Sequence, residues 1–245
     1  MFSCEAQFRF VRTIDQVSFI NEIYSEDQYA AVTQWKSTCT ALGYGQEIPM
    51  TQTATRYPLP DLNALPDDIR SKILEVQEKS GFIPNVFLAF ARRPAEWRAF
   101  FAYHDALMLR AESSLTKGER EMIITTTSAA NHCLYCVVAH GAILRIYEKK
   151  PLVADQVAVN YRKADITPRQ RAMLDFAMQV CTQSHTVDDA DFAALHAHGF
   201  DDEDIWDIAG ITAFFGLSNR MANVTGMMPN PEFYLLGRTP KKPAS

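Results

Sequence analysis

The stretch from Glu121 to His140 reads EMIITTTSAANHCLYCVVAH, and it decides both the expected fold and the expected chemistry. It contains a C-x-x-C pair, Cys133 and Cys136. His140 follows the second cysteine by four residues, and Glu121 precedes the first cysteine by twelve. Two thiols, an imidazole and a carboxylate are the groups that a thiol redox site needs, because one sulfur attacks, the other resolves, and acid–base groups move the protons.

The sequence around this stretch predicts an all-α fold. Its apolar residues recur at intervals of three and four, and no long alternating β pattern stands out. Thr116–Glu119 is a T-x-x-E capping box that begins a helix carrying Glu121, and Thr167–Gln170 is a T-x-x-Q box with Pro168 at the first helical position. Further helical segments are expected over residues 66–80, over 86–90, from 94, from 186 or 188 to 199, and from 201 onward.

Glu121 can act on the cysteines only if the chain folds back between them. Twelve residues of continuous helix span about 18 Å, whereas proton transfer needs contacts of about 3 Å. Asn131-His132 is a plausible helix break, which would end one helix and start the next. If Cys136 begins that second helix, His140 lies one turn later on the same face, and the free N–H groups of the helix start favour a thiolate.

Two other interpretations of the cysteine pair stay open. The thiols could be ordinary packed core residues. They could also ligate zinc together with His140 or His132, with Glu121 as a possible fourth ligand. No second paired set of ligands is present in the sequence, which disfavours the zinc site.

Composition restricts the remaining classes of function. The chain has 245 residues with 47% hydrophobic and 22% charged side chains, which is typical of a packed globular protein. The net charge of -5 argues against a general nucleic-acid binder. No apolar run is long enough to span a bilayer, and the N-terminus lacks the apolar core of a signal peptide, so a cytoplasmic protein is expected. No metal, flavin or nicotinamide signature is visible, and no cofactor is expected.

The five cysteines do not form a disulfide framework of the secreted type. Their number is odd, and apart from the C-x-x-C pair they lie far apart in the sequence. Cys181 lies within an apolar helical pattern, so we expect it to be a small buried core residue.

The first residues differ in character from the rest. Residues 1–49 carry weaker signals for the starts and ends of helices, and Gly43-Tyr44-Gly45 interrupts the chain near their end. The sequence from Met50 then resembles the beginning of a protein chain. We therefore expect an N-terminal extension over 1–49, with Met50 as an alternative start of translation. Residues 50–245 would form one helical domain with a frayed C-terminal tail.

Several motifs resemble one known family, the carboxymuconolactone decarboxylase and alkylhydroperoxidase D superfamily. Its peroxidatic members have the spacing E-x11-C-x-x-C-x3-H, which the four residues above match. The similarity is more specific to an uncharacterised peroxidase-related branch. Its motifs are matched by GFIPNVF at 81–87, RPAEWRAFF at 93–101, EREMI at 119–123, NHCLYCVVAH at 131–140, and the pattern DIWDIA…FF…NR at 204–220. The similarity covers about residues 58–235.

The resemblance implies an all-α fold of the alkylhydroperoxidase D type, assembled into homo-oligomers such as trimers or hexamers. It also implies that Cys136 is the peroxidatic thiol and Cys133 the resolving thiol, with Glu121 as distal base and His140 as proton relay. Alkylhydroperoxidase D itself has a histidine directly before the second cysteine, where this chain has Tyr135. True lactone decarboxylases lack the cysteine pair, so decarboxylation is not expected.

Two residues near the pair are possible auxiliary members of the site. Two interpretations stay open for each: His132 either supplies an imidazole in place of the missing family histidine or only ends a helix, and Tyr135 either forms a hydrogen-bonding wall of the pocket or belongs to the core. The aromatic residues Phe100, Phe101, Phe214 and Phe215 are candidates for lining a pocket for an organic hydroperoxide, although helix packing is the better explanation for most of them.

The leading hypothesis is a thiol peroxidase that reduces hydrogen peroxide or organic hydroperoxides, with an external dithiol as its reductant. The alternatives are a general dithiol–disulfide oxidoreductase and a non-catalytic redox sensor or scaffold. Sustained turnover of peroxide would separate the enzyme from the sensor, which undergoes one oxidation per subunit.

Overall fold

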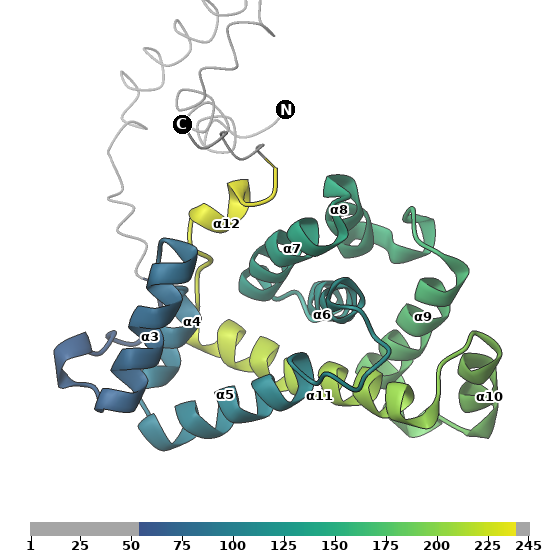
Figure 1. Ribbon diagram of the computed structural model, residues 1–245, viewed down its shortest axis with the longest axis horizontal. Helices are drawn as coiled ribbons and strands as arrows, with labels where there is room; N and C mark the ends of the chain where they lie inside the picture. The colour runs from purple at the N-terminus through teal and green to yellow at the C-terminus, as the bar shows by residue number, and fades with distance from the viewer. Residues whose placement is uncertain (1–53, 239–245) are drawn as a thin grey trace, which may run out of the picture. The chain divides into compact units, whose positions relative to one another are not determined.

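The computed structural model describes residues 54–238, and residues 1–53 and 239–245 lie outside the described part. Every regular element within the described part is helical, which confirms the predicted all-α class (Figure 1). The predicted extension over 1–49 and the alternative start at Met50 fall outside this range. The α-helices are α3 (Asp67–Ser80), α4 (Asn85–Ala91), α5 (Pro94–Met108), α6 (Lys117–Ala130), α7 (Leu134–Glu148), α8 (Pro151–Asn160), α9 (Pro168–Gln183), α10 (Asp189–Ala197), α11 (Asp202–Thr225) and α12 (Glu232–Leu235).

The helix starts follow local capping chemistry. Both predicted capping boxes form, that of Thr116 at α6 and that of Thr167 at α9. In each box the threonine hydroxyl accepts a backbone N–H of the first turn, which would otherwise lack a partner. Gly81 follows α3 with a φ of 85°, the left-handed conformation that glycine adopts without strain.

Helix α6 lies at the centre of the fold. Figure 1 shows it end-on, with α7, α8, α9 and α11 around it. All residues from Gly118 to Ser128 are buried, on every side of the helix. A helix buried in this way is normally apolar throughout, yet α6 carries glutamates, threonines and a serine. Each of these polar side chains must therefore find a partner inside the protein or remain unpaired.

The long helix α11 packs against α6 with an apolar stripe. Ile208, Ile211 and Phe215 are 0–2% exposed and belong to the main core. Burying one such side chain contributes roughly 1.5–3 kcal/mol. The same helix then carries buried polar residues toward its C-terminal end, where it passes the cysteines.

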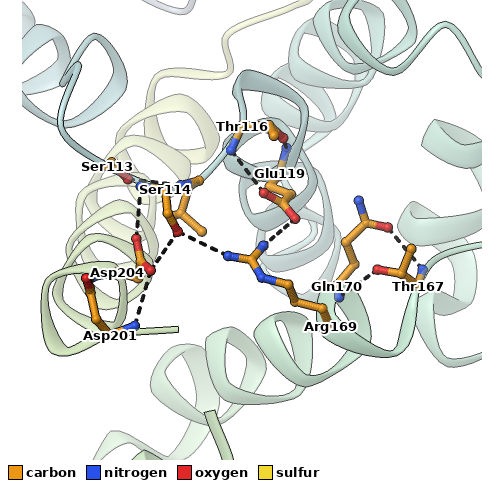
Figure 2. Close-up of polar contacts among 10 residues, drawn as sticks. Ser113, Ser114, Thr116, Glu119, Thr167, Arg169, Gln170, Asp201 and Asp204 are labelled. Carbon is orange, nitrogen blue, oxygen red and sulfur yellow. Dashed lines mark hydrogen bonds and ion pairs between the residues drawn. The ribbon is translucent and has the colours of Figure 1, made fainter. Parts of the chain in front are cut away.

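A polar network joins the N-terminal ends of α6, α9 and α11 (Figure 2). Arg169 donates to Glu119 Oε1 at 2.7 Å and to Ser114 Oγ at 3.1 Å. Ser114 donates its hydroxyl and its backbone N–H to the two oxygens of Asp204, at 2.6 and 3.1 Å. Since Glu119 and Asp204 also belong to capping boxes, the network ties three helix starts together. We call Ser114, Thr116, Glu119, Arg169 and Asp204 the capping network.

Two helices were not expected from the sequence. Helix α8 begins with Pro151 at its first position, where proline is favoured. The apolar pattern of the sequence did not indicate a helix there. Helix α12 lies in the segment that we expected to fray, and that expectation is wrong for these residues because Phe233 is buried against Phe82. None of the described helices combines the length and apolar character needed to cross a membrane.

Candidate active site

The chain reverses direction between α6 and α7 in the turn from Asn131 to Cys133. The N–H of His132 donates to the carbonyl of Ala129, and the N–H of Cys133 donates to the carbonyl of Ser128, both at 3.0 Å. These are the two hydrogen bonds of a Schellman motif, in which the second residue after the last helical residue takes a left-handed conformation. His132 occupies that position with a φ of 52°. The predicted break in the helix is therefore confirmed.

The reversal brings Glu121 of α6 next to His140 of α7. Glu121 Oε2 lies 2.8 Å from His140 Nδ1, and the two side chains are 6% and 14% exposed. The ring of Phe215 packs edge-on against the imidazole with 4.8 Å between centroids. The carboxylate and imidazole thus form a hydrogen-bonded pair that is largely shielded from water.

The two cysteines lie at the start of α7. Cys133 is the N-cap residue, and its Sγ accepts the backbone N–H of Cys136 at 3.4 Å. Both thiols are free, and the two residues are only 0% and 1% exposed. The helix begins at Leu134 and not at Cys136, which corrects the predicted start. Cys133 consequently holds the N-cap position, where free N–H groups stabilise negative charge.

The surroundings act on the two thiols in opposite directions. The hydrogen bond from the Cys136 thiol is the largest effect lowering the pKa of Cys133, which moves from 9.0 to about 7. The Cys136 N–H, the charge of His140 and a hydrogen bond from Asn219 act in the same direction, while burial opposes them. The pKa of Cys136 is raised, first by its hydrogen bond with Cys133 and then by burial and the Cys133 charge. These opposite directions favour Cys133 as the residue that carries the negative charge when the reduced pair loses one proton.

Three polar residues, Ser128, Ser218 and Asn219, lie beside the cysteines. The sequence did not indicate that they belong to the site. Ser218 Oγ is 4.0 Å from Cys136 Sγ, and Asn219 Nδ2 donates to Ser128 Oγ at 2.9 Å. Hydrogen bonds from Asn219 and Ser218 both act to lower the pKa of Cys136. The available signal was the Ser218-Asn219 pair itself, which interrupts the apolar pattern of a helix that is otherwise buried there.

Neither of the two possible auxiliary residues makes a hydrogen bond to the cysteine sulfurs among the described residues. His132 is exposed on the turn, and its role there is to adopt the left-handed backbone conformation that the turn requires. Tyr135 is buried, and its hydroxyl accepts the backbone N–H of Val86 at 3.3 Å. Burial raises the pKa of Tyr135. This tyrosine therefore fastens the cysteine helix to the start of α4.

Cys181 on α9 is half-buried and not fully buried, so the prediction of a core residue is only partly correct. Asn131 Nδ2 lies 3.5 Å from Cys181 Sγ and 2.9 Å from Asn219 Oδ1. Burial raises the pKa of Cys181, which keeps it a neutral thiol. Cys181 therefore lies at the edge of the hydrogen-bonded groups around the cysteine pair and does not carry the negative charge of that pair.

The zinc alternative requires at least three ligand side chains arranged around one point. Within residues 54–238 no such group of histidine, cysteine, aspartate or glutamate side chains occurs. The Glu121 carboxylate is instead paired with the His140 ring.

Comparison with known proteins places the chain in a family. Residues 94–151, which span α5 to α7 and contain all four principal site residues, match the carboxymuconolactone decarboxylase family. The crystal structure of a protein from Ralstonia eutropha, described as an alkylhydroperoxidase AhpD core and an uncharacterized peroxidase-related protein, is 76% identical to this chain. The match covers 77% of this chain and 98% of that one, with a TM-score of 0.75. The chain belongs to the carboxymuconolactone decarboxylase family, as an AhpD-like member.

Two other solved structures are similar to this chain. An uncharacterized peroxidase-related protein from a Silicibacter species is 44% identical, with a TM-score of 0.72, covering 76% of this chain and 97% of that one. A debrominase is similar in fold alone, at 21% identity and a TM-score of 0.62, covering 77% of this chain and 98% of that one. No curated protein matches the chain. The resemblance inferred from the sequence motifs is confirmed.

Proposed function

We propose that this AhpD-like protein is a thiol peroxidase that reduces hydrogen peroxide or organic hydroperoxides through Cys133 and Cys136. The observation that carries the proposal is the placement of the cysteine pair at a helix start, close to a shielded Glu121–His140 pair. A helix start supplies N–H groups to a thiolate, and a carboxylate–imidazole pair can accept and return protons. The peroxidase-related relatives support the same chemistry.

The first step of the proposed cycle is attack on the peroxide. The negative charge of the reduced pair rests on Cys133, which takes the proton of Cys136 along their shared hydrogen bond. The Cys136 thiolate, which Asn219 and Ser218 then stabilise, attacks one peroxide oxygen. An S–O bond forms and the O–O bond breaks, which leaves a sulfenic acid on Cys136 and an alkoxide or hydroxide that takes up a proton.

The second step closes the disulfide. Cys133 passes this proton through the His140–Glu121 pair to the alkoxide or hydroxide of the first step and attacks the sulfur of the sulfenic acid as a thiolate. An S–S bond forms, the S–O bond breaks, and the departing hydroxide takes a proton from solvent and leaves as water. An external dithiol then reduces the disulfide by two exchange steps and is itself oxidised. This external reductant is part of the proposal.

An apolar pocket next to the site suits the organic part of a hydroperoxide. It lies between α5 and α11, has a volume of about 520 Å³, and is lined by Phe100, Phe214 and Leu217 among others. Phe214 also contacts Phe215, whose ring packs on His140. Of the four aromatic residues proposed from the sequence, these contacts favour a lining role for Phe100 and Phe214, whereas Phe215 shields the imidazole.

The direct test is peroxide consumption by the reduced protein with dithiothreitol, using hydrogen peroxide and cumene hydroperoxide as substrates. We expect saturable, repeated turnover that is lost when Cys136→Ser or Cys133→Ser is introduced. Faster turnover of cumene hydroperoxide would support the apolar pocket. One stoichiometric oxidation without turnover would replace the enzyme by a redox sensor, and no oxidation at all would remove the redox function.

Two further expectations are also proposals, one from the family resemblance and one from the composition of the sequence. A homo-oligomer, trimeric or hexameric, would be measured by light scattering of the purified chain. A cytoplasmic location would be measured by fractionating cells that express the natural protein.

A further inference from the structure

Thr125 on α6 has a hydroxyl group that is completely buried and has no hydrogen-bond partner among the described residues. Buried threonines in helices usually donate to the carbonyl four residues earlier, as Thr127 and Thr212 do here, each at 2.8 Å. A buried hydroxyl without a partner costs about 1–3 kcal/mol, so such a group is rare unless something else uses it.

Helical spacing places Thr125 on the face of α6 that meets the cysteine helix. Glu121, Thr125 and Ser128 are separated by four and three residues, which puts them in one row along the helix. Glu121 touches His140 at one end of this row. Thr125 therefore lies in the middle of the α6 surface that faces α7.

The facing row on α7 has the same intervals in the opposite direction. His140, Cys136 and Cys133 are separated by four and three residues. At the far end of the rows the N–H of Cys133 donates to the carbonyl of Ser128 at 3.0 Å. Both end pairs are in contact, and the chain reverses between the two helices. The two middle residues, Thr125 on α6 and Cys136 on α7, therefore lie at the same height along the two antiparallel helices.

We propose that Thr125 is a positioning residue for Cys136: its hydroxyl donates a hydrogen bond to the sulfur when Cys136 is a thiolate, and to the added oxygen when it is a sulfenic acid. The second half of this statement rests on the proposed peroxidase function, whereas the first half does not. Ser218 and Asn219 approach Cys136 from α11, so Thr125 would add a donor from the opposite helix. In this structure no hydrogen bond joins the Thr125 hydroxyl to Cys136 Sγ, so the proposal requires the hydroxyl to turn toward the sulfur when the negative charge or the added oxygen appears on Cys136.

The neighbouring Thr126 is a matched control. It is 3% exposed, and its hydroxyl also lacks a partner among the described residues. It lies about 100° around the helix from Thr125 and therefore points to a different face. Threonine and valine have nearly the same shape, so Thr125→Val and Thr126→Val each remove only an unpaired hydroxyl. Both variants should fold with undiminished stability.

The test measures the pH dependence of Cys136 alkylation by iodoacetamide, followed by mass spectrometry of the Cys136 peptide, in a Cys133→Ser background. Loss of one hydrogen bond to a thiolate should raise the midpoint by about half a unit to one unit in Thr125→Val. Thr126→Val should leave the midpoint unchanged, and Thr125→Ser should restore it. Equal midpoints in the two valine variants would overturn the proposal.

A second measurement reads the oxidised state in the same background. After one equivalent of hydrogen peroxide, trapping with dimedone reports the lifetime of the Cys136 sulfenic acid. We expect a lifetime several-fold shorter in Thr125→Val than in Thr126→Val. If no sulfenic acid forms in any variant, the peroxidase proposal fails, while the alkylation midpoints still decide whether Thr125 acts on Cys136.

Discussion

Two groups of buried polar side chains lie along α6, and they differ in how completely their hydrogen-bonding atoms are paired. In the capping network both carboxylate oxygens of Glu119 and both of Asp204 have partners, at distances of 2.6 to 3.2 Å. In the cysteine site, which consists of Glu121, Cys133, Cys136 and His140, the contacts of the thiols with the Cys136 N–H and the Ser218 hydroxyl are long, at 3.4 and 4.0 Å. Nearby Thr125 makes none.

This difference separates polar groups that hold the fold from polar groups available for chemistry. A fully paired network stabilises one arrangement of the helices, because breaking any bond leaves a buried group unsatisfied. Weakly paired groups contribute little to the fold but can form new bonds when charge moves or an oxygen atom is added. Thr125, whose buried hydroxyl is unpaired and lies on the same helix row as Glu121, is available for such a bond in the cysteine site.

The sharpest way to test this contrast uses two glutamates only two residues apart on α6. Glu121→Gln should slow peroxide turnover by about 10²–10⁴-fold, the usual contribution of a general base. Its free energy of unfolding should change little, since the amide can still hydrogen-bond His140. Initial rates across a peroxide titration measure the first effect. Unchanged turnover would show that the Glu121–His140 pair has no role in proton transfer.

Glu119→Gln is the matched partner of that substitution. The amide keeps the capping box but loses the ion pair with Arg169, whose side chain is 30% exposed. We expect a loss of about 1–2 kcal/mol in the free energy of unfolding, with normal peroxide turnover in the folded protein. Denaturant titration of both glutamine variants measures the comparison. If Glu119→Gln reduced turnover as much as Glu121→Gln, the proposed division between the two groups would be wrong.

The charge of the reduced pair gives a prediction with a defined pH window. The pKa of Cys133 is lowered from 9.0 to about 7 in the folded protein, so folding favours its thiolate. The resulting stabilisation, on the order of 2 kcal/mol, is complete near pH 9 and is lost as the pH falls through 7. Ultraviolet absorbance of the thiolate, taken as the difference between the reduced protein and Cys133→Ser, should show a midpoint near 7. A midpoint near 9.0 would mean that the Cys136 thiol and the other hydrogen-bond donors around Cys133 do not stabilise its thiolate.

The smallest effect is expected at His132, which belongs to the turn and not to the cysteine site. Glycine adopts the left-handed conformation of this residue without strain but is more flexible in the unfolded chain. His132→Gly should therefore change the free energy of unfolding by no more than about 1 kcal/mol and leave peroxide turnover intact. A tenfold loss of turnover would restore the imidazole to the site as an auxiliary group.

The helices could be predicted where local chemistry is strong. The Thr116 and Thr167 boxes fixed two helix starts, and Asn131-His132 indicated the reversal that the site needs. Helix α8 was missed, because its apolar residues give a weak periodic signal and only Pro151 marks its start.

The reactive residues could be predicted from spacing, but their polar surroundings could not. The four principal residues lie within twenty positions of one another, so their pattern is visible in the sequence. Ser218 and Asn219 come from a helix more than eighty residues away, and only tertiary packing brings them to Cys136 and Ser128. The missing partner of Thr125 is likewise a property of packing. The lowered pKa of Cys133 depends first on the hydrogen bond from the Cys136 thiol and also on the Cys136 N–H, which Cys133 accepts as the N-cap residue of a helix that starts at Leu134.

The most direct test of the account is a single oxidation of the fully reduced protein, followed by peptide mapping with mass spectrometry. One equivalent of hydrogen peroxide should produce a Cys133–Cys136 disulfide in the unmodified chain. In Cys133→Ser the same treatment should leave a dimedone-reactive sulfenic acid on Cys136. A pair that stays reduced while peroxide is consumed, or oxidation confined to Cys181, would contradict the assignment of the chemistry to the start of α7.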